Sequence, residues 1–200
     1  MHMRRLIWIP IIHTQTDFGS LGAPYEELYK KKIGQDRWNQ HARMVDQLWR
    51  TIRRDVENLH LDYTTVRLYQ DGLPDCDTVA QIVEELARRG SANHQLLLEL
   101  IKKGAKLTGT ESPELLREEY EVFRKALEFA RADELEKLES LDGERSKELL
   151  RKRDHFIARR IAETLGAGET GLIFLGMLHS IKDHLPPDIE LRVVGQKRHM

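Results

Sequence analysis

The sequence predicts an α/β protein with a mostly parallel central sheet of about five strands flanked by helices. One observation behind this prediction is that short runs rich in β-branched and aromatic residues alternate with longer segments. The other is that the longer segments carry apolar residues at every third or fourth position, as helices do. Strands that alternate with helices in this way form parallel sheets. We interpret all 200 residues as a single domain, since this length allows a sizeable core.

The helical segments between the predicted strands have recognisable ends. Asp36–Leu59 has an apolar stripe at helical spacing. Asp77 is the expected N-cap of a helix that ends at Gly90. Asn93 is the expected N-cap of a helix that ends at Gly104. The predicted strands are Arg5–Ile12, Thr65–Tyr69, Ala105–Gly109, Leu172–Met177 and Glu190–Val194.

A charged helical insertion is predicted near residues 114–150. Ser112 and Pro113 favour the start of its first helix. The strongly charged stretch Arg131–Arg153 follows and has the pattern of an exposed helical hairpin that turns at Asp142. Charges of mixed sign at helical spacing are typical of a solvated surface. The alternative is an arm that contacts a partner, including a second copy of this chain.

Composition limits the range of partners. Lys and Arg together number 32 and Asp and Glu 33, so no net field attracts nucleic acid or an anionic membrane. No segment approaches the roughly 20 apolar residues that a membrane helix needs. The single cysteine, Cys76, excludes an intramolecular disulfide and fits a reducing compartment. We therefore expect a cytoplasmic protein that binds neither nucleic acid nor a membrane.

Polar side chains stand where each of the first four predicted strands ends. Ligands of parallel sheets bind beyond the carboxyl ends of the strands, so we expect a pocket for a small polar substrate or ligand at this edge. The alternative is ordinary loop chemistry, because polar residues commonly follow strands. The residues concerned are His13, Asp17, Gln70, Asp71, Glu111, His179 and Ser180.

His13 and His179 are the most informative of these residues. A neutral imidazole can bind a divalent transition metal or transfer a proton near neutral pH. Glu111 can act as a metal ligand or a base, or its negative charge can interact favourably with the N-terminal end of the dipole of the helix that follows it. Asp71 can be a further metal ligand, or a turn residue before Gly72. Histidine with carboxylate fits zinc, manganese, cobalt and iron.

Arg153 is out of place on its helix. It lies three or four residues from apolar positions such as Ile157, and thus on the predicted buried face. A buried arginine is costly unless it is paired or reaches the edge of the core. Arg153 can therefore bind an anionic oxygen, clamp an active-site carboxylate, or form a purely structural ion pair. Its neighbours Asp154, Arg159 and Arg160 are predicted to lie on the exposed flank.

Motifs of the common nucleotide-binding and serine-hydrolase sites are missing. The sequence contains no GxxxxGK[ST] loop, no GxGxxG and no GxSxG. Cys76 has no convincing partner nearby in the sequence and is not expected to be a nucleophile. The strand-end residues therefore carry the functional prediction.

Three short motifs resemble the Tiki, TraB, ChaN and erythromycin-esterase group of α/β proteins. They are "WIPIIHT" with His13, "RDHFIARRI" with Arg153, and "LGMLHS" with Gly176 and His179. In that group a first strand runs into a histidine, a late helix carries an Arg-Asn or similar pair, and the next strand ends in Gly-x-x-His. The resemblance covers the two ends of the chain, about a third of it.

This resemblance implies a shared site at those motifs, completed by acidic residues. Some members are metal-dependent proteases or esterases, and others are linked to haem uptake. The chain departs from the group after strand two, where Gln70 and Asp71 stand in place of the usual glutamate. It also has Asp154 in place of the asparagine and Pro10 where a glycine is often found. Glu111 can supply the missing carboxylate.

Three hypotheses follow. The first is a metal-assisted hydrolase, in which both histidines and a carboxylate hold the ion and Arg153 stabilises the oxyanion. The second is a metal-free hydrolase with one histidine as the general base. The third is a binding or sensing module without turnover. All three require His13, Glu111, Arg153 and His179 to converge on one pocket.

Overall fold

The structure, a computed structural model, describes residues 3–131 and 143–194. All five predicted strands are present, and they form one parallel sheet in the order β3-β2-β4-β1-β5. The predicted α/β fold is thus confirmed. The strands are β1 (Arg4–Ile11), β2 (Val66–Gln70), β3 (Lys106–Leu107), β4 (Thr170–Gly176) and β5 (Ile189–Val193).

The predicted helices are also present, with two corrections at their starts. The N-cap of α3 is Thr78 and not Asp77. The N-cap of α4 is Ser91 and not Asn93, because the Ser91 side chain accepts a hydrogen bond from the His94 amide while Asn93 is buried within the helix. The helices are α1 (Gly22–Ile33), α2 (Gln35–Glu57), α3 (Val79–Arg88), α4 (Ala92–Lys102), α5 (Pro113–Arg131) and α7 (Gly143–Thr164).

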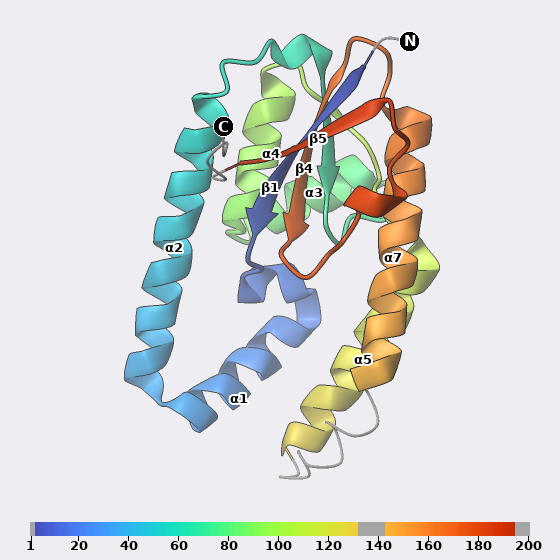
Figure 1. The fold of residues 1–200 in the computed structure, drawn as a ribbon. Coiled ribbons are helices and arrows are strands. Elements are labelled where there is room, and N and C mark those ends of the chain that lie inside the picture. The colour runs from blue at the N-terminus through green and yellow to red at the C-terminus, as the bar shows by residue number, and fades with distance from the viewer. Residues whose placement is uncertain (1–2, 132–142, 195–200) are drawn as a thin grey trace, which may run out of the picture.

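One helical region is not predicted by the sequence patterns above. After β1 the chain forms a short 3-10 helix, η1 (Gln15–Leu21), and continues directly into α1. In Figure 1, α1 and the lower ends of α5 and α7 extend beyond the carboxyl ends of β1 and β4. This region therefore adds a wall beside the predicted site.

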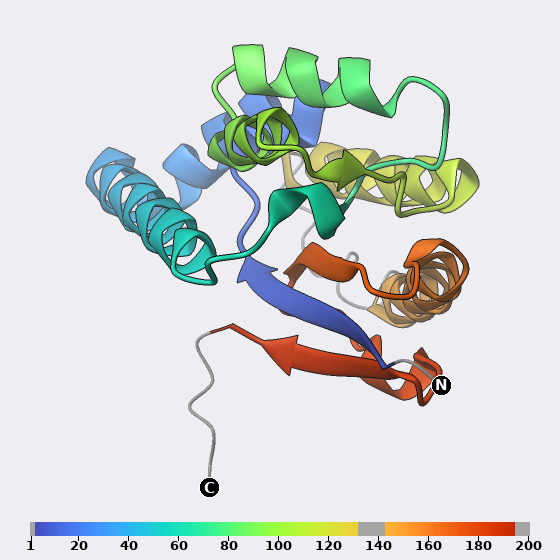
Figure 2. The ribbon, with the colours of Figure 1, turned by 90° about the horizontal axis from the view of Figure 1, so that it is seen from above.

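Helices cover both faces of the sheet, as the alternation of side chains along the strands requires. Ile7 and Ile9 of β1 pack with residues of α2, α3 and α4, whereas Leu6 packs with residues of α7. Figure 2 shows α2, α3 and α4 on one side of the sheet and α7 on the other. The apolar stripe predicted for Asp36–Leu59 faces this core through residues such as Trp49 and Val56.

The strand order places β1 and β4 side by side, with Ile11 opposite Gly176 at their carboxyl ends. The connection from β1 crosses β4 to reach β2, and the connection from β4 crosses β1 to reach β5. Because these two connections leave in opposite directions, the ends of β1 and β4 form the kind of crevice in which open α/β sheets bind ligands.

The charged insertion is described only in part. α5 ends at Arg131 and α7 begins at Gly143, and the two helices contact one another. The predicted turn at Asp142 lies outside the described residues, as does much of the stretch 131–153 proposed above for self-association. In the part of the chain that is described, no helix combines the length and apolar composition needed to span a membrane.

The loops after β2 and β3 pass one another at Gly109. A Cβ atom at this position would lie 2.6 Å from both the Asp75 Cα and the Pro74 carbonyl oxygen. Gly109→Ala is therefore expected to lower the free energy of unfolding by about 2 kcal/mol, because the two loop backbones would have to move apart to admit the added methyl group. Urea denaturation measures this effect. Gly143→Ala, where an added Cβ meets nothing within 4 Å, is the control, and equal effects of the two variants would contradict the account.

Candidate active site

Arg153 joins the ends of several elements through its guanidinium group. Its Nε atom donates to Glu111 Oε2 at 2.5 Å, and Nη2 donates to Glu111 Oε1 at 2.8 Å and to Asp71 Oδ1 at 2.7 Å. Its Nη1 atom donates to Glu119 of α5. The side chain of Arg153 is only 5% exposed. These contacts fit two of the roles predicted for Arg153, the clamp on an active-site carboxylate and the structural ion pair.

Asp71 connects this arginine to both histidines. Its second oxygen, Oδ2, lies 3.0 Å from His13 Nε2 and 3.4 Å from His179 Nε2. The same oxygen accepts a hydrogen bond of 2.9 Å from the Gly176 amide. A side chain at Gly176 would place its Cβ 3.0 Å from this oxygen, so glycine allows the close approach. The expected convergence is present in part: His13, Glu111, Arg153 and His179 belong to one cluster with Asp71 at its centre, but Glu111 is fully buried and does not line the cavity at this cluster.

Asp154 completes the site and corrects a prediction. It is buried rather than exposed, and its Oδ1 atom lies 2.6 Å from His179 Nδ1. Its Oδ2 atom accepts from the Ser180 amide at 2.9 Å. The prediction was wrong because the buried face of α7 is wider than its apolar residues indicate. This face includes both Arg153 and Asp154. The Arg-Asn pair of the resembling group was the available signal for this residue.

Arg159 and Arg160 of α7 were also predicted to be exposed, and the structure confirms this for only one of them. Arg159 is exposed, as expected. Arg160 is half-buried, and it donates to Asp75 Oδ1 at 2.6 Å and to the Gly109 carbonyl oxygen at 3.2 Å. Arg160 therefore supports the same two loops that hold Glu111. It is a structural contact and does not line the candidate site.

Charges within the cluster shift the pKa values of its members. Burial disfavours the Asp71 carboxylate, but the bonds to His13 and His179 outweigh it and hold the pKa of Asp71 well below its usual 3.8. Burial lowers the pKa of His179, but Asp154 and Asp71 raise it to about 9. Burial likewise opposes protonation of His13, and Asp71 nevertheless raises the pKa of His13 above 6.5. At neutral pH Asp71 is therefore an anion held between cationic or polar neighbours.

A cavity of about 620 Å³ opens onto one side of this cluster. Five of the predicted residues line it, namely His13, Asp17, Asp71, Arg153 and His179. The structure thus brings both histidines and the central carboxylate to one surface. The cavity is bounded by η1, by the ends of β1 and β4, and by α5 and α7.

Three predicted site residues do not line the cavity. Glu111 is fully buried behind Asp71, and its Oε1 atom also accepts from the Gly72 amide at 2.6 Å. Gln70 is buried and donates to the Asp71 carbonyl oxygen at 3.0 Å. Ser180 is exposed, and its amide bonds Asp154. These residues surround the site rather than face its opening.

Asp17 anchors the loop that follows His13. Its carboxylate accepts from the Thr14 amide at 2.7 Å and from the Ser91 hydroxyl at 2.6 Å. Ser91 also lies 2.7 Å from His94 Nδ1. These are the residue types of a hydrolytic triad, but Ser91 is completely buried and no substrate can reach its hydroxyl. The cluster therefore fixes η1 against the start of α4.

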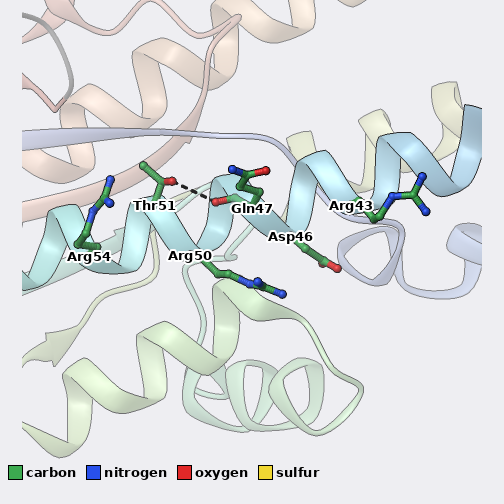
Figure 3. Close-up of a pocket in the computed structure, with 6 residues that line it drawn as sticks. All are labelled: Arg43, Asp46, Gln47, Arg50, Thr51 and Arg54. Atoms are coloured by element: carbon green, nitrogen blue, oxygen red, sulfur yellow. Dashed lines mark hydrogen bonds between the residues drawn. The ribbon is translucent and has the colours of Figure 1, made fainter.

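A second hollow, of about 570 Å³, lies on α2 (Figure 3). Its walls are side chains of that one helix, among them Arg43, Arg50 and Arg54, all exposed to solvent. The figure shows one hydrogen bond there, from the Thr51 hydroxyl to the Gln47 carbonyl oxygen at 3.1 Å. It lacks the buried, paired titratable groups that distinguish the strand-end cavity.

The residue types of the cluster are suited to bind a metal, but their nitrogen and oxygen atoms face one another rather than a shared position for an ion. His13, His179 and Asp71 are residue types that bind divalent transition metals, and Asp154 would orient His179 as a carboxylate orients a ligating imidazole. In the described residues, however, no group of three or more His, Cys, Asp or Glu side chains is arranged to hold an ion. The two imidazoles contact Asp71 directly instead.

Comparison with known proteins adds no relative. No family model matches the chain, and no significant match is found among curated proteins or solved structures. The resemblance to the Tiki, TraB, ChaN and erythromycin-esterase group stays a prediction based on three motifs.

Loss of Arg153 should strongly destabilise the protein. Arg153→Met would leave Glu111 buried without its cation and remove one cationic partner of Asp71, and we expect the free energy of unfolding to fall by about 3–5 kcal/mol. Arg159→Met, on the same helix but exposed, should change it by less than about 0.5 kcal/mol. Urea denaturation at neutral pH compares the two. Similar small changes in both variants would show that the buried ion cluster is not what holds the strand ends together.

Proposed function

We propose that this protein is a hydrolase that cleaves carboxylic esters with water, with His13 as the general base. The observation that carries the proposal is the contact of 3.0 Å between His13 Nε2 and Asp71 Oδ2 at the cavity surface. An ionised carboxylate that accepts from one imidazole nitrogen orients the ring and leaves the other nitrogen free to accept a proton.

The free nitrogen of His13 is Nδ1. Among the described residues it has no hydrogen-bond partner, and the side chain is 30% exposed. In the proposed reaction Nδ1 takes a proton from water as the water oxygen attacks the ester carbonyl carbon. The bond from this carbon to the alkoxy oxygen then breaks, and the imidazolium returns the proton to that oxygen. The products are a carboxylic acid and an alcohol.

Water is the proposed nucleophile because the described cavity lining includes no Ser, Thr or Cys side chain. An ester suits this chemistry better than an amide, since an alkoxide is a better leaving group than an amide anion. A guanidinium has five N–H donors, and Arg153 uses four of them on carboxylates. The remaining Nη1 donor is assigned in this proposal to the carbonyl oxygen.

His179 and Asp154 are proposed as positioning residues. His179 is buried, and its pKa of about 9 means that it carries a proton at neutral pH. Together with Arg153 it keeps Asp71 ionised and correctly oriented toward His13. The free, exposed Cys76 fits a reducing compartment, so a cytoplasmic location is part of the proposal.

A metal-assisted version is the second candidate. The bond from Asp154 to His179 favours it, because a carboxylate commonly orients a ligating imidazole in this way. Zinc, manganese, cobalt or iron would be held by His13, His179 and Asp71 and would activate water. In this version His13 is a ligand and not the base.

Replacement of His13 tests the catalytic assignment. His13→Gln should lower kcat/KM for p-nitrophenyl ester hydrolysis by about 100-fold or more, while the exposed His184→Gln should leave it unchanged. Because the base must be neutral and Asp71 raises the pKa of His13, wild-type kcat/KM should rise with pH with a midpoint above 6.5. Activity retained in His13→Gln would refute the assignment. Binding without any turnover would instead favour the ligand-binding or sensing module.

Chelation separates the two hydrolase versions. We expect ester hydrolysis to survive exhaustive dialysis against a chelator, because the proposed base and its partners belong to the chain itself. Loss of activity that zinc, manganese, cobalt or iron restores would favour the metal-assisted version. Elemental analysis of the wild type and of His179→Ala gives an independent readout of bound metal.

A further inference from the structure

We infer that the substrate has a large apolar body, such as a medium-length acyl chain, beside its ester group. This inference rests on the proposed function and names its substrate class. It replaces the sequence-based expectation of a small polar substrate. The geometry behind it is a cavity whose charged groups gather at the strand ends while its remaining walls are apolar.

The apolar walls come from segments far apart in the sequence. Residues of β1, η1, α5 and α7 contribute Ile11, Phe18, Leu116, Phe123 and Leu150. The rings of Phe18 and Phe123 lie 5.1 Å apart between centroids and thus join η1 to α5. A volume of about 620 Å³ is in the range of sites for small organic molecules. A chain or ring of carbon atoms binds favourably to such walls because binding removes apolar surface from contact with water.

The rim of the cavity is apolar and exposed. Four large apolar side chains line it while remaining open to solvent: Ile12 at 36%, Tyr120 at 40%, Met177 at 65% and Leu178 at 85% exposed. Large apolar residues gathered at one opening mark a binding surface, whereas isolated ones do not. Met177 and Leu178 follow β4 directly and stand two and one residues before His179, so the apolar rim adjoins the reacting groups.

The charges in the lining exclude a substrate with a second anionic end. Asp17, Asp71 and Glu119 are carboxylates. The cationic groups of the lining, Arg153 and the protonated His179, are already bonded to carboxylates. No lysine lines the cavity among the described residues. An anionic tail would therefore lose its hydration without gaining a free cation. A neutral apolar tail meets no such cost.

A series of p-nitrophenyl esters tests this inference. Wild-type kcat/KM should rise at least tenfold from the acetate to the octanoate ester, mainly through KM. The monoester of octanedioic acid, in which a carboxylate replaces the terminal methyl group of the octanoate ester, should lose most of that gain. Highest kcat/KM with the acetate ester, or equal values for the neutral and anionic octyl chains, would overturn the inference and leave the proposed hydrolysis intact.

Matched variants locate the selectivity. Leu178→Ser should reduce the octanoate-to-acetate ratio of kcat/KM several-fold, whereas Met44→Ser, at another exposed apolar residue that lies on α2, should leave it unchanged. Equal ratios in both variants would refute a role for the rim. Binding of the apolar fluorophore N-phenyl-1-naphthylamine to His13→Gln gives a readout without turnover. Binding that Leu178→Ser weakens supports an apolar site even if no ester is hydrolysed, and absence of binding overturns it.

Discussion

The pairing of Arg153 with two buried carboxylates is the constraint on which the site depends. Through Asp71 it orients both histidines, and through Glu111 it holds the loops that follow β2 and β3. Glu119 extends the same cluster to α5. Well-packed apolar residues often stabilise a core as well as a buried ion cluster does. The stability of the fold alone therefore does not require this cluster.

The apolar walls of the cavity strengthen the electrostatic interaction between Asp71 and His13. The Asp71 side chain is only 4% exposed and the Phe18 ring lies 6.2 Å from the His13 ring between centroids, and charges interact more strongly where water is excluded. The carboxylate can then raise the pKa of His13 despite burial, which by itself acts in the opposite direction. An apolar substrate body would exclude still more water from the same groups.

Much of this arrangement follows from patterns in the sequence. Alternating strands and helices predicted the parallel sheet, and the sheet in turn predicted that His13 and His179 would meet at one edge. Arg153 was recognisable because a charge interrupted an apolar stripe. The inward orientation of Asp154 was not, since apolar periodicity assigns a polar residue to the surface. The packing of η1 and α1 beside α5 depends on tertiary contacts such as that of Phe18 with Phe123, so the apolar cavity could not be predicted.

The protonation state of His13 shows whether Asp71 prepares this imidazole to act as a base. Nuclear magnetic resonance of protein labelled with ¹⁵N in its histidine rings reports both the tautomer and the pKa. We expect neutral His13 to carry its proton on Nε2, bonded to Asp71, and its pKa to lie above 6.5. A neutral ring protonated on Nδ1, or a pKa below 6.5, would contradict the role of Asp71 and with it the proposed base.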